Sequence, residues 1–317
     1  MNAMNDHELW DLIRQAYAAI ARHYDPVAER ITAESGLDAR TWGALLAVFT
    51  FDLTPSPLHP PSPLLAGEGK GGWGVGARYF LVRGPYTAAE AYQSRLAAAA
   101  NKGYLAEGAL GEYRLTEAGR TATARFVAEL RTAMAQSDPL PPAEAARLAS
   151  LLDRLVQASL HTPPPPDTWS ISLADKLMPA ADPPLPYIEQ LISCLTAYRD
   201  DAHLAAWRPS GLSATALESL TLLWRGEADS LEALGQKLAP RGHPRQVYAQ
   251  ALAELRQRGF ITGPDETPRL TEAGRAFRDQ VEADTDRYFF APWACLDADG
   301  KEELVSLLIR LRDGLKT

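Results

Sequence analysis

The heptapeptide RLTEAGR occurs twice in this chain, at Arg114–Arg120 and at Arg269–Arg275. Residues on both sides of it also match between the two halves of the sequence. The positions that correspond at a separation of 156 include Tyr92 and Tyr248, Leu96 and Leu252, Gly103 and Gly259, Leu148 and Leu304, and Leu155 and Leu311. Self-similarity over this length predicts an internal duplication in which the two copies fold alike.

The length of the chain and the position of a proline run agree with two copies. The 317 residues, of which 46% are hydrophobic, are enough for two cores of ordinary size. The run HTPPPPD at His161–Asp167 cannot continue a helix and is typical of an extended linker. We therefore expect one copy over residues 1–160 and a second over residues 161–317.

Charge and cysteine content narrow the class of protein. A formal net charge of -8 is unusual for a general nucleic-acid binder, so any contact with DNA has to be local. Cys194 and Cys295 are too few for a disulfide framework and lack the spacing of a metal pair. The N-terminal MNAMNDHELW has no signal-peptide pattern, and no apolar run approaches the roughly 20 residues of a membrane helix. The expected location is the cytoplasm.

One segment breaks the symmetry between the copies. The interval from Gly36 to Tyr92 is 56 positions and the corresponding interval in the second copy is 37, so the first copy has 19 extra residues. The excess lies in TPSPLHPPSPLLAGEGKGGWGVG, residues 54–76, whose proline and glycine content disfavours both helix and sheet. We expect a disordered surface loop without a role; the alternative is a lid or docking peptide centred on Trp73.

The second copy has the order of elements of a winged helix-turn-helix. An amphipathic helix is predicted over about 213–225, a short helix over 230–238 with Ser230 as N-cap, and a longer helix over 243–258 that Gly259 ends. Short strands at FIT and RL then flank the turn GPDETP, and Thr271 is placed to cap the next helix. The repeated heptapeptide is thus predicted to lead from the wing into a helix.

The segments KGYLAEGALGEYRLTEAGR and RGFITGPDETPRLTEAGR resemble the MarR-type winged-helix regulators, in which a recognition helix, a wing and an LT-x-x-G-R segment follow one another. The resemblance covers most of both copies. Because members of that family are homodimers, it implies a mainly α fold with small β-wings (α+β), arranged as a tandem winged helix-turn-helix and an intramolecular pseudo-dimer. The chain is then a monomeric pseudo-dimer or forms a further homodimer. Its wing turns are short and acidic, unlike the D-x-R pattern of the family, which weakens their insertion into DNA.

The helix predicted over 243–258 carries the residues that we expect to contact double-stranded DNA. With Tyr248, Leu252 and Leu255 facing inward, the outward side has polar and basic side chains suited to adenine, guanine and phosphate. The expected DNA-binding residues of the second copy are Arg241, Arg245, Gln246, Gln250, Arg256 and Gln257. The alternative is that this side is only a solvated helix face.

The first copy has a poorer helix for the same task. Its outward positions are Glu90, Ser94, Ala97 and Asn101, and Arg95 is the basic residue that we expect to contact DNA. We predict one competent reading head and one degenerate one, and therefore unlike half-sites and a shallow dependence of DNA affinity on salt.

Aromatic residues near the predicted seam between the copies point to a small-molecule site. The resemblance to MarR-type proteins implies an effector pocket between the pairing helices and the reading lobe, for a small apolar or aromatic molecule. The residues expected to line it are Tyr198, Arg199, Asp200, His203, Trp207, Trp224 and Trp42. Asp200 and His203 have the spacing of two metal ligands, but no further ligand cluster completes a site, so no metal is expected.

Catalytic motifs are missing from the sequence. It has no nucleophile elbow, phosphate loop or zinc-protease helix, so we expect neither an enzyme nor a bound cofactor. The favoured function is a MarR-like transcriptional regulator whose DNA affinity changes when a small molecule shifts the spacing of the two reading heads. The alternative, favoured by the acidic charge and the poor first copy, is a winged-helix scaffold that has lost DNA binding and binds a ligand or another protein.

Overall fold

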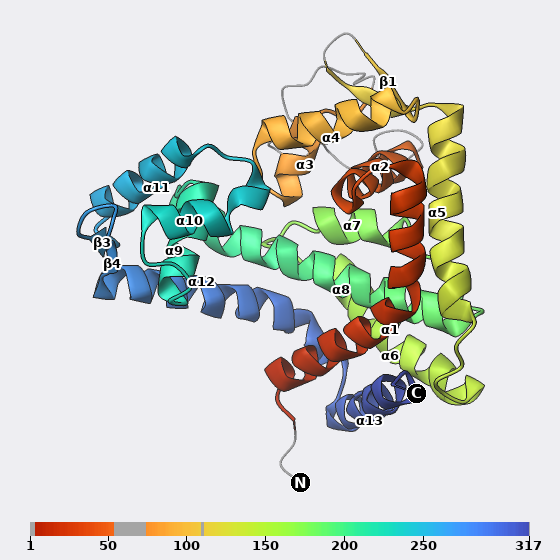
Figure 1. The fold of residues 1–317 in the computed structure, drawn as a ribbon. Helices are drawn as coiled ribbons and strands as arrows, with labels where there is room; N and C mark the ends of the chain where they lie inside the picture. The colour runs from red at the N-terminus through yellow and green to blue at the C-terminus, as the bar shows by residue number, and fades with distance from the viewer. Residues whose placement is uncertain (1–3, 54–73, 109–110, 317) are drawn as a thin grey trace.

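The computed structural model describes residues 4–53, 74–108 and 111–316, which form thirteen α-helices and two antiparallel strand pairs (Figure 1). The first half consists of α1 (Asp6–Ser35), α2 (Ala39–Asp52), α3 (Ala77–Arg83), α4 (Ala89–Asn101), β1 (Leu105–Glu107), β2 (Tyr113–Leu115), α5 (Glu117–Ala135) and α6 (Pro142–Leu160). The second half consists of α7 (Trp169–Asp175), α8 (Pro184–Trp207), α9 (Ala214–Trp224), α10 (Leu231–Lys237), α11 (Arg245–Gln257), β3 (Ile261–Thr262), β4 (Arg269–Leu270), α12 (Glu272–Phe290) and α13 (Ala298–Gly314). Within these ranges, no helix is both long enough and apolar enough to cross a membrane.

The helix starts predicted for the second half are confirmed. The side chains of Ser213, Ser230 and Thr271 each accept a hydrogen bond from the backbone N–H three residues further on, at 3.0–3.2 Å. Each cap therefore satisfies one N–H that the first turn of its helix leaves without an intrahelical partner. Gly259, predicted to end the recognition helix, has a φ of 71°, a left-handed conformation that favours glycine.

Thr116 and Thr271 make equivalent hydrogen bonds in the two copies of the heptapeptide. The hydroxyl of each accepts a hydrogen bond from the N–H of Gly119 or Gly274 at 3.0 Å, which caps α5 or α12. The same hydroxyl donates to the carbonyl of the glycine after the preceding helix. This is Gly103 after α4, at 2.6 Å, and Gly259 after α11, at 2.7 Å. One side chain thus joins the end of the recognition helix to the start of the helix after the wing.

The glycine of the heptapeptide is required by a close backbone approach. A Cβ atom on Gly119 would lie 1.9 Å from the carbonyl oxygen of Tyr104, and one on Gly274 would lie 2.1 Å from that of Phe260. Both separations are far below van der Waals contact, so any side chain would push the helix away from the wing. Both copies of the heptapeptide therefore require glycine at this position.

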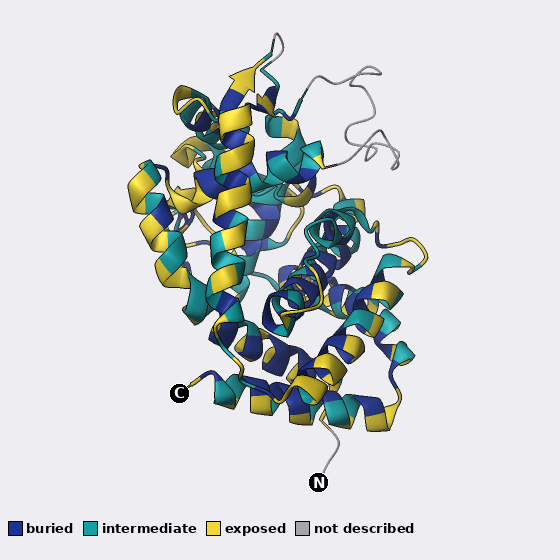
Figure 2. Cartoon of the chain, turned by 90° about the vertical axis from the view of Figure 1, so that its right-hand side faces the viewer, coloured by how far each residue is buried: buried dark blue, intermediate teal, exposed yellow. Residues whose placement is uncertain are grey.

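The described residues have three hydrophobic cores. One lies within the first half, between α2, α4, the β1–β2 pair and α5, and a second lies within the second half, between α9, α10, α11, the β3–β4 pair and α12. We call residues 39–120 head 1 and residues 214–275 head 2. The third core combines residues of both halves, and Figure 2 shows buried residues concentrated where its helices meet, with exposed residues on the outer faces.

The central core joins the halves through reciprocal helix contacts. Helix α1 packs against α5 of its own half and against α13 of the other half. Helix α8 packs in the corresponding way, against α12 of its own half and against α6 of the other half. Arg147 in α6 and Glu303 in α13, which are 156 positions apart in the chain, form an ion pair across this seam (Nη2–Oε2 2.5 Å). Helices at equivalent places in the sequence therefore face each other.

The interpretation of residues 54–76 as a surface loop needs a correction at its end. Residues 54–73, including Trp73, lie outside the described residues. Val75 is buried, with 1% of its surface exposed, and exchanges two backbone hydrogen bonds with Tyr113 at 2.8 and 3.0 Å. The prediction was wrong for residues 74–76, because β2 offers a free edge to which a single residue can pair despite its glycine-rich surroundings.

Candidate nucleic-acid interface

Helix α11 has one buried side and one exposed side. Tyr248, Leu252 and Leu255 follow the spacing of an amphipathic helix and are at most 1% exposed, within the core of head 2. The Tyr248 hydroxyl also donates a hydrogen bond to the Leu238 carbonyl at 3.1 Å, which ties α11 to the end of α10. The rotation of the helix is therefore fixed, and with it the set of residues that faces outward.

The outward side of α11 carries four of the predicted DNA-binding residues. Arg245, Gln246, Gln250 and Gln257 are all exposed. Arg245 has one carboxylate nearby, that of Glu232 with an Nε–Oε2 distance of 4.0 Å. The part of the chain that the structure describes offers the three glutamines no side-chain hydrogen bond. Their amide groups are therefore open to an external partner such as the edge of a base pair.

The other two predicted DNA-binding residues of head 2 already have partners within the protein. The Arg241 guanidinium donates to Glu218 through Nε at 2.7 Å and forms an ion pair through Nη2 at 2.6 Å. The Arg256 guanidinium donates to the Gly263 carbonyl at 2.7 Å and pairs with Asp265, which holds the wing against α11. Contact of either residue with DNA requires that these bonds break or that a free N–H of the guanidinium is used.

Head 1 presents a different surface at the equivalent helix, α4. Glu90, Ser94 and Asn101 are exposed on its outward side, while Ala97 is half-buried. None of these side chains is basic, and Glu90 would face the phosphates of DNA with a negative charge. Arg95, the predicted DNA contact of this copy, is half-buried and lies over the ring of Tyr92, with its Cζ atom 5.1 Å from the ring centroid.

The two heads touch each other at the first turn of α4. The Ala88 N–H donates to the Arg241 carbonyl at 2.8 Å, and Nε2 of His243 lies 3.1 Å from the Tyr86 carbonyl, to which it donates. Arg40, at the start of α2, donates to the Pro240 carbonyl at 3.4 Å. Thr87 and Ala88 are buried by this contact, at 6% and 3% exposure. Head 2 therefore packs against the residues just before α4, at the end of the helix that a recognition helix inserts first into the major groove, while Glu90 stays exposed.

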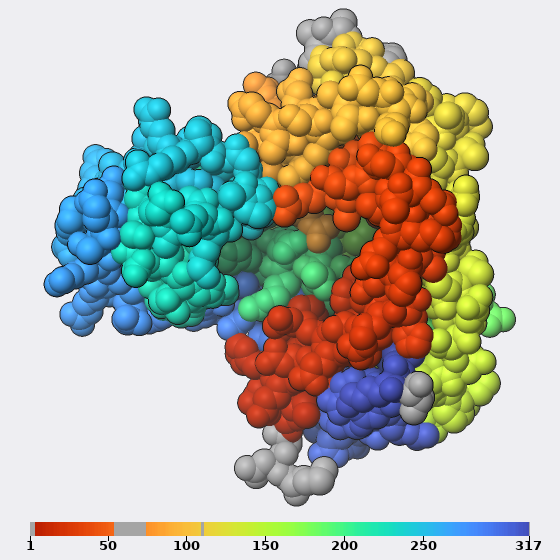
Figure 3. All heavy atoms as spheres, in the orientation of Figure 1, coloured from red at the N-terminus to blue at the C-terminus, as the bar shows by residue number. Residues whose placement is uncertain are grey.

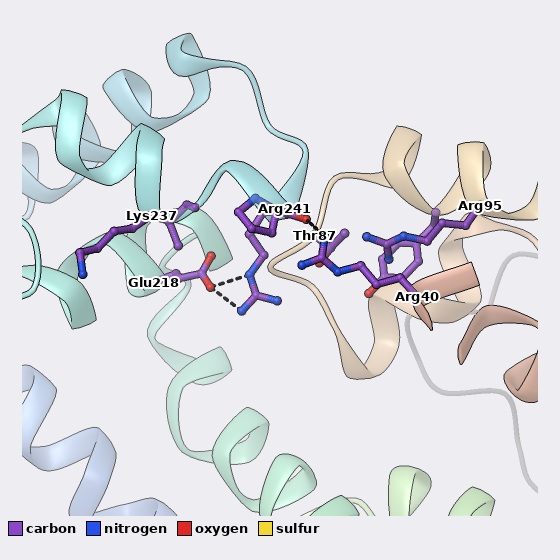
Figure 4. A pocket seen from close by; sticks show the side chains of 9 residues that line it. Arg40, Thr87, Arg95, Glu218, Lys237 and Arg241 are labelled. Atoms are coloured by element: carbon purple, nitrogen blue, oxygen red, sulfur yellow. Dashed lines mark hydrogen bonds and ion pairs between the residues drawn. The ribbon is translucent and has the colours of Figure 1, made fainter. Parts of the chain in front are cut away.

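A hollow lies between the heads, α1 and α8. Figure 3 shows it open toward the viewer, with α8 as its floor and the two heads on either side. At the contact between the heads, a cavity of about 410 Å³ is lined by Arg40, Thr87, Tyr92, Arg95, Glu218, Lys237, Leu238, Pro240 and Arg241 (Figure 4). Sequence reasoning did not find this group, because its members come from four separate helices and a turn, and no spacing along the chain marks them.

Comparison with known families supports the assignment of the second half. Residues 170–316, from α7 to α13, match the model of a helix-turn-helix family. Residues 170–316 contain a helix-turn-helix domain. The comparisons with curated proteins and with solved structures find no match. A helix-turn-helix domain in general indicates DNA binding and a regulatory role.

The seven residues expected to line an effector pocket are distributed over the helix-turn-helix domain and head 1. Trp42 lies in the core of head 1, stacked on Phe126 with ring centroids 4.7 Å apart. Trp224 is at the end of α9, where its Nε1 donates to Asp279 at 2.8 Å. The remaining five, Tyr198, Arg199, Asp200, His203 and Trp207, follow one another along α8. Trp42 therefore lies in a different core from the α8 group, whereas Arg278, whose Cζ atom is 5.1 Å from the centroid of the Trp224 ring, also acts on His203 of that group.

The predicted pair Asp200 and His203 points to different partners. Asp200 forms an ion pair with Arg83 of head 1 (Oδ2–Nη2 2.7 Å). His203 is packed against α12, where Nδ1 lies 3.1 Å from the Thr285 hydroxyl, and burial together with nearby Arg278 lowers its pKa to about 4. The two side chains serve as links from α8 to head 1 and to α12.

Proposed function

We propose that the chain is a MarR-like transcriptional regulator that binds double-stranded DNA through head 2. The observation that carries this proposal is the outward side of α11, on which Arg245, Gln246, Gln250 and Gln257 are exposed together. Gln forms two hydrogen bonds with adenine in the major groove, and Arg binds guanine or phosphate. The acidic charge of the whole chain is compatible with this, because only the face of α11 has to approach the DNA.

We also propose that the chain arose by duplication, with a first copy over residues 1–160 and a second over residues 161–317, and that it is an intramolecular pseudo-dimer. The common order of elements, the identical capping by Thr116 and Thr271, and the reciprocal packing of α1 and α8 support this origin. A pseudo-dimer keeps both heads in one polypeptide, so DNA affinity does not depend on dimerisation.

Control by a small apolar or aromatic molecule is part of the proposal, and catalysis is not. Its site is expected where α8 enters head 2, around His203 and Trp207. Both side chains are largely buried, and the indole N–H of Trp207 interacts with the Tyr86 hydroxyl of head 1 without forming a hydrogen bond of good geometry. A ligand that accepts a hydrogen bond from the Trp207 indole changes the angle between α8 and head 2 only if it binds one orientation of head 2 more tightly than another.

The double substitution Arg245→Ala/Gln246→Ala tests DNA binding. We expect the wild-type chain to retain genomic fragments in a filter assay at low salt, and the double variant to lose that retention. Arg14 and Gln15, an adjacent exposed Arg–Gln pair in α1, provide the matched control Arg14→Ala/Gln15→Ala, which should bind as the wild type does. Equal retention by the α11 variant removes this helix from the proposal.

The alternative function is a scaffold that has lost DNA binding and binds a ligand or another protein. The contact of head 2 with Thr87 and Ala88, just before α4, favours it, because a dimeric reader normally presents two freely accessible recognition helices. Failure of the wild-type chain to retain any fragment at low salt, together with correct folding by circular dichroism, supports the scaffold and removes the regulator.

A further inference from the structure

The cavity between the heads brings together positive charges from both halves of the chain. Arg40 and Arg95 reach it from head 1 and Arg241 from head 2, and Lys237 also lines it, with its side chain extended away from the three arginines (Figure 4). Glu218 is the one carboxylate in the lining. Burial raises the pKa of Glu218, while its bonds to Arg241 lower it, so burial is the stronger effect. The lining is therefore cationic in a chain whose net charge is -8.

Most of this positive charge has no counter-ion in the structure. Glu218 is engaged by Arg241 alone. The pKa of Asp38 is lowered mainly by hydrogen bonds from Thr41, whose N–H donates to the carboxylate at 2.7 Å as the cap of α2, and Arg95 and Arg40 lower it less, from a distance. Among the described residues, no carboxylate lies within 4.0 Å of the Lys237 ammonium. The docked heads thus hold like charges near one another, which disfavours this arrangement unless an anion is present.

We propose that this cavity binds a small organic phosphate carrying at least two negative charges. Guanidinium groups bind phosphate through paired hydrogen bonds, and Lys237, whose flexible side chain starts at the cavity wall, adds a point charge by turning toward the anion. The volume of about 410 Å³ lies within the range of small-molecule sites. Tyr92, Leu238 and Pro240 supply an aromatic ring and apolar surface for the organic part. Because the cations come from both heads, the bound anion bridges them.

Bridging connects the ligand to the arrangement of the heads. The anion neutralises the repulsion across the contact and strengthens the bonds that Ala88 and His243 make to the opposite head. This keeps the first turn of α4 covered and fixes the orientation of α11 relative to the rest of the molecule. The regulatory consequence rests on the proposed function, since it concerns how head 2 meets DNA, whereas binding of the anion does not.

Inorganic pyrophosphate is the probe for the site, measured by titration calorimetry at constant ionic strength. We expect binding to the wild-type chain and at least tenfold weaker binding to Arg95→Gln/Lys237→Gln, a loss of about 1.4 kcal/mol or more. Lys237 is exposed, and Arg95 is half-buried at the cavity wall, outside the hydrophobic cores, so the variant should fold. The control Arg14→Gln/Lys316→Gln removes one arginine and one lysine far from the cavity and should bind pyrophosphate as the wild type does.

Hydrogen exchange of the Ala88 amide tests the bridge itself. This N–H donates to the Arg241 carbonyl of the opposite head, so pyrophosphate should slow its exchange in the wild type and leave it unchanged in Arg95→Gln/Lys237→Gln. No binding to the wild type, or equal binding to that variant, overturns the proposal. A second outcome also overturns the proposal: Arg95→Gln/Lys237→Gln loses DNA retention, while pyrophosphate does not change DNA retention by the wild type. In that case the cavity binds backbone phosphates of DNA. Loss of retention in the α11 variant with intact pyrophosphate binding separates this site from the DNA-binding proposal.

Discussion

Heads 1 and 2 share an order of elements but differ in how they are attached to the molecule. Head 1 rests on the second half, where Arg83 pairs with Asp200 and the Val82 carbonyl accepts a hydrogen bond from Arg208 at 2.6 Å. Figure 1 shows head 2 projecting from the rest of the chain on α8 and α12. Head 1 is therefore packed against the second half of the chain, whereas head 2 leaves the outward side of α11 exposed.

The difference follows from a few side chains at the first turn of the recognition helices. At the start of α4, Ala88, Ala89 and Ala91 are small and only Glu90 is long and exposed, so the turn around Gly242 can approach until a Cβ atom there would lie 2.9 Å from that of Ala91. In α11 the corresponding residues are Pro244, Arg245 and Gln246, all exposed. Small residues suit a covered contact between the heads, and long polar residues suit a surface that contacts solvent or DNA.

The largest expected effect comes from filling the close approach in each head. Gly119→Ala and Gly274→Ala each place a Cβ atom 1.9 or 2.1 Å from a carbonyl oxygen. Each substitution should lower the free energy of unfolding by about 3 kcal/mol or more. Urea unfolding followed by circular dichroism measures this. Gly43→Ala in head 1 and Gly235→Ala in head 2 are the matched controls, because no atom lies within 4 Å of the new Cβ. If the two junction variants unfold at the control midpoints, the heptapeptide does not have the structural role assigned to it.

The order of elements was predictable because local rules decide it. Ser213, Ser230 and Thr271 cap helices through bonds that span three residues, and the wings are short hairpins, so the chain near each element determines its form. The addition of Val75 to the wing and the docking of the heads were not predictable, since both depend on groups far apart in the sequence. The sequence marked Arg95 and Arg241 only as DNA contacts and gave no signal for the cavity, because the residues that line it meet only after the halves fold together.

A medium effect concerns Asp201, which belongs to the second half alone. Its carboxylate accepts hydrogen bonds from the N–H groups of Ser170 and Ile171 at 2.9–3.0 Å and so holds α7, which has no counterpart in the first half, against α8. Burial raises the pKa of Asp201 from 3.8 to about 7, and the hydrogen bonds offset only part of that shift. The folded chain therefore binds more protons than the unfolded chain between these two values.

Stability should consequently fall as the pH rises through this window. From pH 5 to pH 7 the wild type should lose about 2 kcal/mol of unfolding free energy through Asp201. Asp201→Asn keeps an acceptor but does not titrate, so its curve should lack this fall; Asp200→Asn, at the exposed neighbour, should retain it. The pKa of His203 is lowered to about 4, so its contribution to stability has the opposite sign: it is present above pH 6.5 and is lost as the pH falls. This contribution is the same in the wild type and in Asp201→Asn, and it cancels when one curve is subtracted from the other. Parallel curves for wild type and Asp201→Asn would contradict the assignment.

The smallest effect, and the most direct test of the contrast between the heads, exchanges one pair of equivalent residues. Gln246 in α11 corresponds to Glu90 in α4, both exposed and 156 positions apart. Gln246→Glu gives head 2 the character of head 1, and repulsion from phosphates with loss of an amide donor should weaken DNA binding at least tenfold, about 1.4 kcal/mol. Glu90→Gln should change affinity by less than about twofold, because head 2 is docked against Thr87 and Ala88 and so restricts the approach of DNA to the N-terminal end of α4. Fluorescence anisotropy with a labelled retained fragment measures both, and a large gain in affinity for Glu90→Gln shows that α4 reaches DNA after all.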